Sequence, residues 1–267
     1  MIPFVKAHAC GNDFLVVQEN LAGVEPRDEL TRRLCHRNHG IGADGVEFLT
    51  WGAERKGKIR LHNADGSIAE ISGNGTRCAA AWIAYETKAG PGDEIVLETD
   101  AGRRICRIDS RNGSGFQITS SMGVPEIATA NLPLGGGERI EGAVVSTGNP
   151  HFVIFVDQPD FTAHGYPWEI IGEKICRHAA FPQQTNVEFV RMTGRDEIEI
   201  RIYERGVGPT SSSGTGTCAT GSAAIALRGA SRVLRVISPG GPQTVDWRGD
   251  EILLTGPAEL VCFGEAW

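Results

Sequence analysis

The segment Ser72-Gly73-Asn74-Gly75-Thr76-Arg77-Cys78 recurs as Ser213-Gly214-Thr215-Gly216-Thr217-Cys218, and its two leading serines lie 141 positions apart. The same offset relates Val46-Glu47-Phe48 to Val187-Glu188-Phe189 and Ile59-Arg60-Leu61 to Ile200-Arg201-Ile202. A looser pair, Gly11-Asn12 and Gly148-Asn149, is offset by 137. Self-similarity at a fixed spacing is the signature of a repeated structural unit. The chain is therefore predicted to contain two copies of one domain.

The length of 267 residues is compatible with this duplication. Two domains of roughly 130 residues would each be large enough to bury a core of their own. We place an N-terminal domain at residues 1–117 and a C-terminal domain at residues 118–257. The return of the C-terminal segment 258–267 to the first domain is left open.

Composition argues against two classes of partner. The net charge is −7 and no run of Lys or Arg stands out, so the chain lacks the basic footprint of a nucleic-acid binder. It also lacks the roughly 18 to 20 consecutive apolar residues that span a bilayer, and its start does not have the form of a signal peptide. We expect a cytoplasmic protein that binds neither nucleic acid nor membranes.

The seven cysteines form an odd set without a C-x-x-C pair. This pattern disfavours a disulfide framework and a zinc site. We expect most of the cysteines to be small buried side chains and predict no metal site.

Short β-rich runs separated by turn residues dominate the chain and predict a strand-rich fold. We expect strands at 14–17, 46–49, 58–61, 94–97, 104–108, 143–145, 151–155, 187–190, 197–202 and 251–254. Helical patterns are fewer and predict helices at 27–35, 75–87, 168–178 and 216–227. In each half, one Ala-rich helix is apolar nearly all round, which is typical of a buried helix. The predicted class is α+β, with a mostly antiparallel sheet wrapped around a central helix in each of two pseudo-symmetric domains.

Each serine-glycine loop leads into a predicted helix. The first N–H groups of a helix have no intrahelical partner and the helix dipole favours an anion there, so two such ends could share one carboxylate. The alternative is that the glycines only form tight turns. Neither loop carries the motif of a nucleotide site.

Polar residues gather where predicted strands meet loops. Asn63 corresponds to Glu204 under the 141 offset, and Arg205 follows Glu204. Asn12, Asn149 and Asn186 lie in Gly-Asn or Asn-Val contexts. Such a set suits a small zwitterionic ligand, although a turn-forming role for each single Asn stays open.

Several motifs together resemble the diaminopimelate epimerase family, and they run in the family's order across essentially the whole chain. They are His8-Ala9-Cys10-Gly11-Asn12-Asp13-Phe14, Gly40-Ile41-Gly42-Ala43-Asp44-Gly45, Asn63-Ala64-Asp65-Gly66, Gly73-Asn74-Gly75-Thr76-Arg77-Cys78, Gly148-Asn149-Pro150-His151, Asn186-Val187-Glu188-Phe189, Glu204-Arg205-Gly206-Val207-Gly208 and Thr255-Gly256-Pro257-Ala258.

The resemblance implies an epimerase without a cofactor, in which two cysteines exchange the α-proton on opposite faces of a substrate held in the cleft between the two domains. Here both cysteine positions are serine, Ser72 and Ser213. A serine hydroxyl has a far higher pKa than a thiol and needs an activating base. We predict His151 and Glu204 as the activating groups.

The resemblance also assigns the ligand-binding residues. The backbone N–H groups of one set would hold the α-carboxylate: Gly73, Asn74, Gly214 and Thr215. The amino groups and the distal carboxylate would be bound by Asn12, Asn63, Asn149, Asn186, Glu204 and Arg205, of which Arg205 is the natural bidentate partner of a carboxylate.

The expected activity is the interconversion of LL- and meso-diaminopimelate, in lysine and peptidoglycan precursor synthesis. Three origins of the serines stay open: an engineered pair, a natural variant that works with activated hydroxyls, and a catalytically silent homologue that only binds its ligand. A racemase of another amino acid on the same fold is the alternative activity. A homodimer is also left open.

Overall fold

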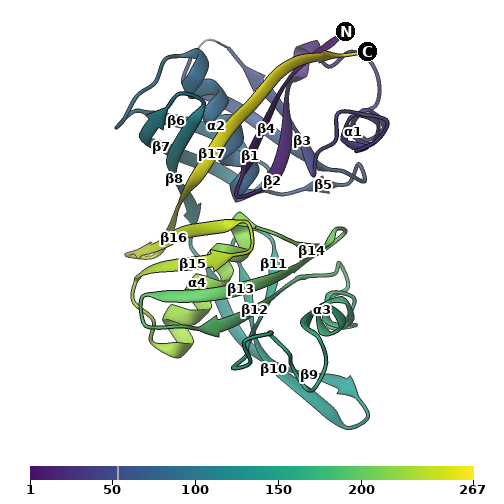
Figure 1. Ribbon diagram of the computed structural model, residues 1–267, viewed down its shortest axis with the longest axis vertical. Coiled ribbons are helices and arrows are strands. Elements are labelled where there is room, and N and C mark those ends of the chain that lie inside the picture. The colour runs from purple at the N-terminus through teal and green to yellow at the C-terminus, as the bar shows by residue number, and fades with distance from the viewer. Residues whose placement is uncertain (53) are drawn as a thin grey trace. The chain divides into compact units, whose positions relative to one another are not determined.

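A computed structural model describes residues 1–52 and 54–267 (Figure 1). The described chain divides into two compact units. The first contains Met1–Ser121 and Thr255–Trp267, and the second contains Met122–Leu254. The last thirteen residues thus pack with the beginning of the chain.

The first unit is built mainly from strands, with two α-helices and one short 3-10 helix. Its elements are β1 (Ile2–Ala9), β2 (Asn12–Gln18), η1 (Glu19–Leu21), α1 (Arg27–Cys35), β3 (Gly45–Trp51), β4 (Lys56–Asn63), β5 (Ile68–Ala69), α2 (Gly73–Glu86), β6 (Glu94–Thr99), β7 (Gly102–Asn112), β8 (Gly115–Gly123) and the main part of β17 (Glu251–Ala266).

The strand pairings of this unit form a closed ring. Strand β1 pairs with β2 and β17, β2 with β3, β3 with β4, β4 with β6, β6 with β7, β7 with β8, and β8 with β17. The β2–β3 and β4–β6 pairs are parallel, whereas the other registered pairs are antiparallel. Closure leaves no strand edge within the ring.

Helix α2 supplies the core of this ring. Its residues from Gly73 to Ala81, together with Ile83 and Ala84, are buried. The small side chains of Ala79, Ala80 and Ala81 let the surrounding strands approach the helix, and they belong to one hydrophobic cluster with residues of the ring. Helix α1 instead packs with the opposite face of β2 and β3.

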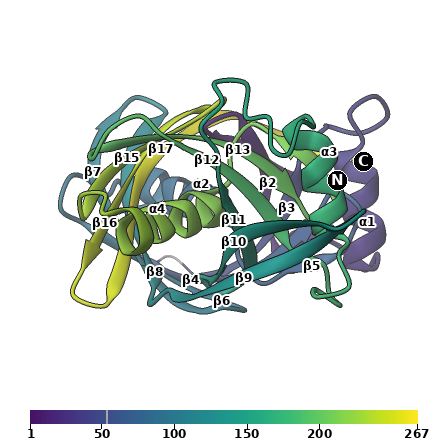
Figure 2. The same ribbon diagram turned by 90° about the horizontal axis from the view of Figure 1, so that it is seen from below.

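The second unit repeats this plan. Its elements are β9 (Glu126–Gly135), β10 (Glu138–Ser146), β11 (Pro150–Phe155), α3 (Trp168–Cys176), β12 (Asn186–Met192), β13 (Glu197–Glu204), β14 (Gly208–Thr210), α4 (Gly214–Arg228), β15 (Val233–Ser238), β16 (Gly241–Arg248) and the first residues of β17. Figure 2 shows α4 lying among the strands of its unit.

The pairings match those of the first unit pair by pair. Strands β11 and β12 are parallel, as β2 and β3 are, and β13 and β15 are parallel, as β4 and β6 are. Helices α1, α2 and strands β3, β4 begin 141 positions before α3, α4, β12 and β13. The 141-residue repeat that three short sequence blocks indicate thus extends to whole elements.

The structure corrects several predicted boundaries. Helices α2 and α4 begin at Gly73 and Gly214, two residues before the predicted starts, because the serine before each glycine caps the helix. Helix α3 ends at Cys176 rather than 178. Seven strands were not predicted, namely β1, β5, β8, β9, β14, β15 and β16. The predicted strand at 251–254 is only the start of β17.

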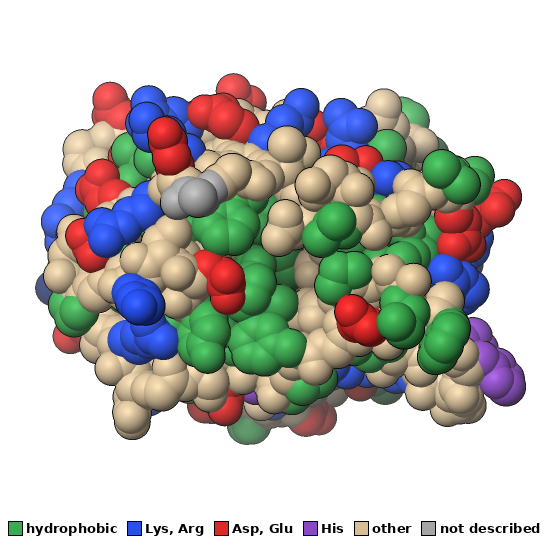
Figure 3. Space-filling model, turned by 90° about the horizontal axis from the view of Figure 1, so that it is seen from above, with side chains coloured by type: hydrophobic (Ala, Val, Ile, Leu, Met, Phe, Trp, Pro, Cys, Tyr) green, Lys and Arg blue, Asp and Glu red, His purple; other side chains and the backbone are tan. Residues whose placement is uncertain are grey.

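The surface carries one feature that the strand patterns did not predict. Apolar side chains gather near the middle of the face drawn in Figure 3, and charged side chains surround them. On the first unit, a groove of about 170 Å³ is lined by apolar residues that include Phe4, Leu21, Trp82 and Phe263.

None of the helices in the described part of the chain has the length and apolarity that a bilayer crossing requires.

Candidate active site

Ser72 is the N-terminal cap of α2. Its backbone is extended, with φ −123° and ψ 123°, and its Oγ accepts a hydrogen bond from the backbone N–H of Gly75 at 3.1 Å. Such a cap satisfies one of the four N–H groups that a helix leaves unpaired at its start. The N–H groups of Gly73 and Asn74 come before this capped position, at the positive end of the helix dipole.

Ser213 caps α4 in the same way. Its Oγ accepts a hydrogen bond from the N–H of Gly216 at 3.2 Å and lies 3.5 Å from the Oγ1 of Thr215. Ser213, Gly214 and Thr215 are all buried. The two loops therefore form equivalent helix starts with a serine hydroxyl at each.

In the first unit, the structure brings Asn12 and Asn74 together. The Nδ2 of Asn74 donates to the Oδ1 of Asn12 at 3.2 Å, and the Nδ2 of Asn12 donates to the Oδ2 of Asp44 at 2.7 Å. The buried Arg77 fixes the loop from the other side, because it donates to Asn74 Oδ1 at 2.6 Å and to the carbonyl of Gly73 at 3.2 Å. Asp44 and Arg77 were not predicted as site residues.

An ion-pair cluster supports Asp44. Arg37 contacts Asp44 at 2.7 Å and Asp13 at 2.9 Å, and Lys6 contacts Asp13 at 3.0 Å. Burial raises the pKa of Asp13, but hydrogen bonds from Arg37 and Lys6 and their positive charges outweigh it, so the pKa lies below its usual value. The cluster thus holds the Asn12 amide in a fixed orientation.

Asn63 ends β4, and the described contacts give it a turn-forming role. Its Nδ2 donates to the Oγ of Ser67 at 3.1 Å, and its backbone N–H donates to the carbonyl of Ser67 at 2.8 Å. It lies opposite Gly45 in the β3–β4 register. The turn-forming alternative considered for each Asn therefore has direct support at this position.

In the second unit, four predicted site residues and Glu188, which was not predicted, form a chain of polar contacts. His151 Nδ1 lies 2.7 Å from Glu188 Oε1, and His151 Nε2 lies 2.9 Å from Asn149 Oδ1. Asn149 Nδ2 donates to Thr215 Oγ1 at 3.2 Å, and Thr215 Oγ1 lies 3.5 Å from Ser213 Oγ. The chain therefore connects a buried carboxylate to the serine cap of α4.

The Glu188 carboxylate fixes the orientation of the His151 ring. A carboxylate only accepts, so His151 Nδ1 donates to Glu188 Oε1, and Nε2 is the ring atom that faces Asn149.

Asn186 and Arg205 also lie together. The Oδ1 of Asn186 accepts a hydrogen bond from the backbone N–H of Arg205 at 2.9 Å, and Arg205 Nη1 donates to the carbonyl of Gln183 at 3.3 Å. His151 and Asn186 are opposite each other in the parallel β11–β12 register. Glu204 ends β13 and is half-buried beside Arg205.

Two buried carboxyl groups near the serines were not predicted as site residues from the sequence. Glu47 on β3 and Glu188 on β12 are fully buried and lie 141 positions apart. A β-carbon placed on Gly75 would lie 2.1 Å from Glu47 Oε1, and one placed on Gly216 would lie 2.8 Å from Glu188 Oε1. Each carboxyl therefore lies directly against the loop that a serine caps. The signal was present, since Glu interrupts an apolar strand at the same position of both repeats.

The cysteines near the loops are packed groups. Cys78 on α2 and Cys218 on α4 have no exposed surface. Burial raises the pKa of the Cys78 thiol far above its usual range. Six of the seven cysteines are buried, and Cys262 is exposed. In the described residues, no group of three or more His, Cys, Asp or Glu side chains is placed to hold a metal ion.

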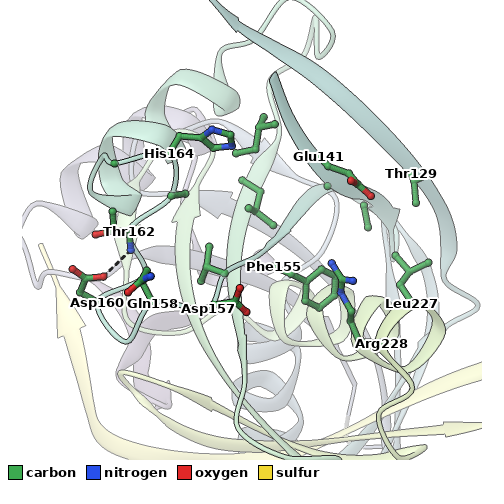
Figure 4. Close-up of a pocket in the computed structure, with 17 residues that line it drawn as sticks. Thr129, Glu141, Phe155, Asp157, Gln158, Asp160, Thr162, His164, Leu227 and Arg228 are labelled. Atoms are coloured by element: carbon green, nitrogen blue, oxygen red, sulfur yellow. Dashed lines mark hydrogen bonds between the residues drawn. The ribbon is translucent and has the colours of Figure 1, made fainter. Parts of the chain in front are cut away.

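A larger cavity, of about 820 Å³, lies in the second unit, and Figure 4 shows its lining. None of the predicted site residues lines it. It includes Leu227 and Arg228 at the C-terminal end of α4, whereas Ser213 caps the other end. The guanidinium of Arg228 lies over the Phe155 ring, 4.6 Å from its centre. Cavity size alone therefore does not identify the site.

The sequence matches a known family over most of its length. The profile of the family described as diaminopimelate epimerase matches residues 4–128 and 143–261. The diaminopimelate epimerase of Moorella thermoacetica is 36% identical over 280 residues, covering 98% of both chains. Diaminopimelate epimerase 1 of a Nostoc species is 38% identical over 285 residues, covering 99% of both chains.

Solved structures with low sequence identity share the fold. A predicted epimerase from Pseudomonas aeruginosa matches with a TM-score of 0.75 at 17% identity, covering all of this chain and 99% of that one. A probable proline racemase from Agrobacterium radiobacter matches with a TM-score of 0.76 at 17% identity, covering all of this chain and 93% of that one. These two matches bear on the fold alone.

Proposed function

Because this chain belongs to the diaminopimelate epimerase family, we propose that it interconverts LL- and meso-diaminopimelate without a cofactor, with Ser72 and Ser213 at the two catalytic positions. The observation that carries this proposal is the pair of equivalent helix starts, each with a capping serine and a buried carboxyl behind it. Epimerisation requires that one α-proton is removed and that one is returned on the opposite face. Two equivalent serine positions would provide one group for each step.

The helix starts would bind the α-carboxylate of the substrate. Backbone N–H groups of Gly73, Asn74, Gly214 and Thr215 are the donors, and both helix dipoles favour the negative charge. The same donors would stabilise the charge that develops on the carboxylate oxygens as the α-proton leaves. One oriented donor of this kind contributes about a hundredfold or more to a rate.

The amides and Arg205 would determine which amino acid is bound. Asn12, Asn149 and Asn186 present amide groups held by Asp44, His151 and Arg205 respectively. Asn63 and Glu204 complete the proposed set at the ends of β4 and β13. The Arg205 guanidinium would pair with the distal carboxylate of diaminopimelate.

Proton exchange by serine needs a group that takes the hydroxyl proton. In the second unit, the chain from Ser213 through Thr215 and Asn149 reaches His151 and Glu188. His151 would be the activating group of Ser213 and would take the proton on Nε2, with Glu188 orienting its ring; Asn149 and Thr215 would position the two side chains, since an amide does not carry a proton. Glu204 stays a predicted second activating group.

The proposal is tested by converting both isomers. Purified protein is incubated separately with LL- and with meso-diaminopimelate, and the isomers are resolved by chiral chromatography. We expect the same equilibrium mixture from both sides, and no conversion of glutamate or proline, which lack the distal ammonium-bearing carbon. Conversion of another amino acid but not of diaminopimelate would instead favour the alternative racemase. The cytoplasmic location and the homodimer stay predictions.

A further inference from the structure

The Glu47 carboxyl is buried beneath the first serine-glycine loop. Side chains alternate along β3, so that Val46 and Phe48 pack toward α1 while Leu49 packs toward α2. Glu47 alternates with Val46 and Phe48 and therefore faces α2. The missing side chain of Gly75 makes room for it, because a β-carbon there would lie 2.1 Å from Glu47 Oε1. The same β-carbon would lie 3.3 Å from Ser72 Cβ, so carboxyl and serine adjoin one face of Gly75.

Its counterpart Glu188 has a partner that Glu47 lacks. Phe14 lies opposite Gly45 in the β2–β3 register, as His151 lies opposite Asn186 in β11–β12. Phe14 therefore occupies the position of His151 in the repeat. Since a phenyl ring has no nitrogen, the first unit has no imidazole for its buried carboxyl. Both oxygens of Glu47 lack a hydrogen-bond partner among the described residues.

This environment changes the acidity of Glu47. Burial raises its pKa to about 8. Cys78 on α2 is within electrostatic range of Glu47, and the other charged or ionisable groups that act on Cys78 are Arg77 on α2, Asp13 on β2 and Cys10 in the turn before β2. None of them makes an ion pair with Glu47 in the described contacts. An unpaired buried carboxyl is costly for stability, and titratable groups with such shifts concentrate at functional sites.

We propose that Glu47 is a positioning residue for Ser72: in the substrate complex the two side chains come within hydrogen-bond distance, and Glu47 takes up the hydroxyl proton of Ser72 while Ser72 Oγ takes the α-proton of the substrate. In this step the Cα–H bond breaks and leaves its electron pair on the substrate carbanion. A new O–H bond forms at Ser72 Oγ, the old one breaks, and its proton moves to a Glu47 oxygen. After this step Ser72 is again a hydroxyl, the carbanion takes a proton on its other face, and Glu47 becomes a carboxylate again by releasing its proton to water. The inference rests on the proposed function. It makes Glu47 the proton acceptor of the first unit, where Phe14 stands at the position of His151.

The test compares Glu47→Gln in two backgrounds. One is the chain with Ser72 and Ser213, and the other carries Ser72→Cys together with Ser213→Cys. The readout is exchange of the diaminopimelate α-proton with heavy water, followed by NMR between pH 6 and 9.5. A thiol ionises without a carboxylate behind it, whereas loss of a general base costs a hydroxyl about a hundredfold or more.

We expect Glu47→Gln to lower exchange about a hundredfold in the serine chain and less than about threefold in the cysteine background. The serine chain should gain activity as the pH rises toward 8, where Glu47 loses its proton, and Glu47→Asp should restore part of the rate. The matched control is Glu94→Gln, on an exposed carboxyl of β6, which should change neither rate nor pH profile.

Three results would overturn the inference. Equal losses in both backgrounds would mean that Glu47 is only structural. An exchange rate of the serine chain that does not change with pH around 8 would also mean that Glu47 is only structural. This measurement needs no variant, so it holds even if Glu47→Gln does not fold. Exchange by the cysteine chain alone would remove the role of Glu47 and leave the substrate assignment intact. Exchange by neither chain would instead reject the proposed function itself.

Discussion

The imidazole of His151 and the carboxyl of Glu188 meet at 2.7 Å in the interior of the second unit, and neither side chain has any solvent exposure. The pair spans the parallel strands β11 and β12 and is two residues out of register, since His151 lies opposite Asn186 and Val153 lies opposite Glu188. Glu188 also lies against Gly216 at the start of α4. The same pair therefore contributes to the packing of the unit and to the proposed activation of Ser213.

Replacing His151 with Phe, the residue at the equivalent position of the first unit, should destabilise the chain. The change leaves Glu188 buried without a partner, and breaking a buried pair in this way costs about 3–5 kcal/mol. Urea unfolding measures the loss. The double variant His151→Phe, Glu188→Leu should recover much of it, because no unpaired carboxyl remains. An unchanged midpoint for His151→Phe alone would show that the pair does not contribute to stability.

Glu47 should make stability depend on pH. The folded chain keeps a proton on Glu47 up to about pH 8, whereas the unfolded chain loses it near 4.5. The stabilising contribution is therefore fully present below pH 4.5 and decreases as the pH rises toward 8.

Glu47→Gln should flatten this decline, so that the variant gains stability relative to the parent between pH 5 and 8, by on the order of a few kcal/mol. Thermal melts across this range would show it. Glu94→Gln serves as the control and should keep the parental slope. A Glu47→Gln curve parallel to the parent would contradict the raised pKa.

Gly75 should not tolerate a methyl group. Gly75→Ala places a β-carbon 2.1 Å from Glu47 Oε1, and overpacking of this kind costs about 1–3 kcal/mol. Differential scanning calorimetry should find that Glu47→Ala removes most of this penalty in the double variant. Gly194→Ala, where the new atom meets nothing within 4 Å, is the matched control. Equal effects at Gly75 and Gly194 would place the carboxyl elsewhere.

The serines should contribute to stability as well as to chemistry. Ser72→Ala and Ser213→Ala each remove the acceptor for one helix N–H. Loss of such a cap costs about 0.5–2 kcal/mol. Urea titration of each variant, with the exposed Ser114→Ala as a control, would resolve the difference. Variants as stable as the parent would mean that the capping hydrogen bonds are replaced by water at no cost.

The sequence predicted the repeat and the elements with regular side-chain patterns. Helix α1 was predicted at its observed bounds, since its apolar residues recur at helical spacing. The α2 and α4 starts were predicted two residues late, because glycine is a poor helix former and the cap contact is formed only in the folded loop. Strands such as β9 and β16 were missed because each contains a proline and a glycine and few β-branched residues, which weakens the strand pattern.

The site was predicted as a set of residues, and the structure supplied their partners. Ser72, Ser213 and the amides were recognised from motifs, whereas Asp44 and Arg77 fix those amides through contacts between distant segments. Glu47 and Glu188 belonged to a repeat block, but periodicity cannot tell a buried Glu in a strand from an exposed one. Only the fold shows that both carboxyls face a serine-capped loop.

The most direct test of the proposed function is exchange of the α-proton of LL-diaminopimelate in heavy water, measured by NMR for this chain and for its Ser72→Cys, Ser213→Cys variant. We predict that both forms replace the α-proton with deuterium and produce the meso isomer, the cysteine form faster. Absence of exchange in both forms, with the proteins folded, would contradict the assignment of diaminopimelate as the substrate.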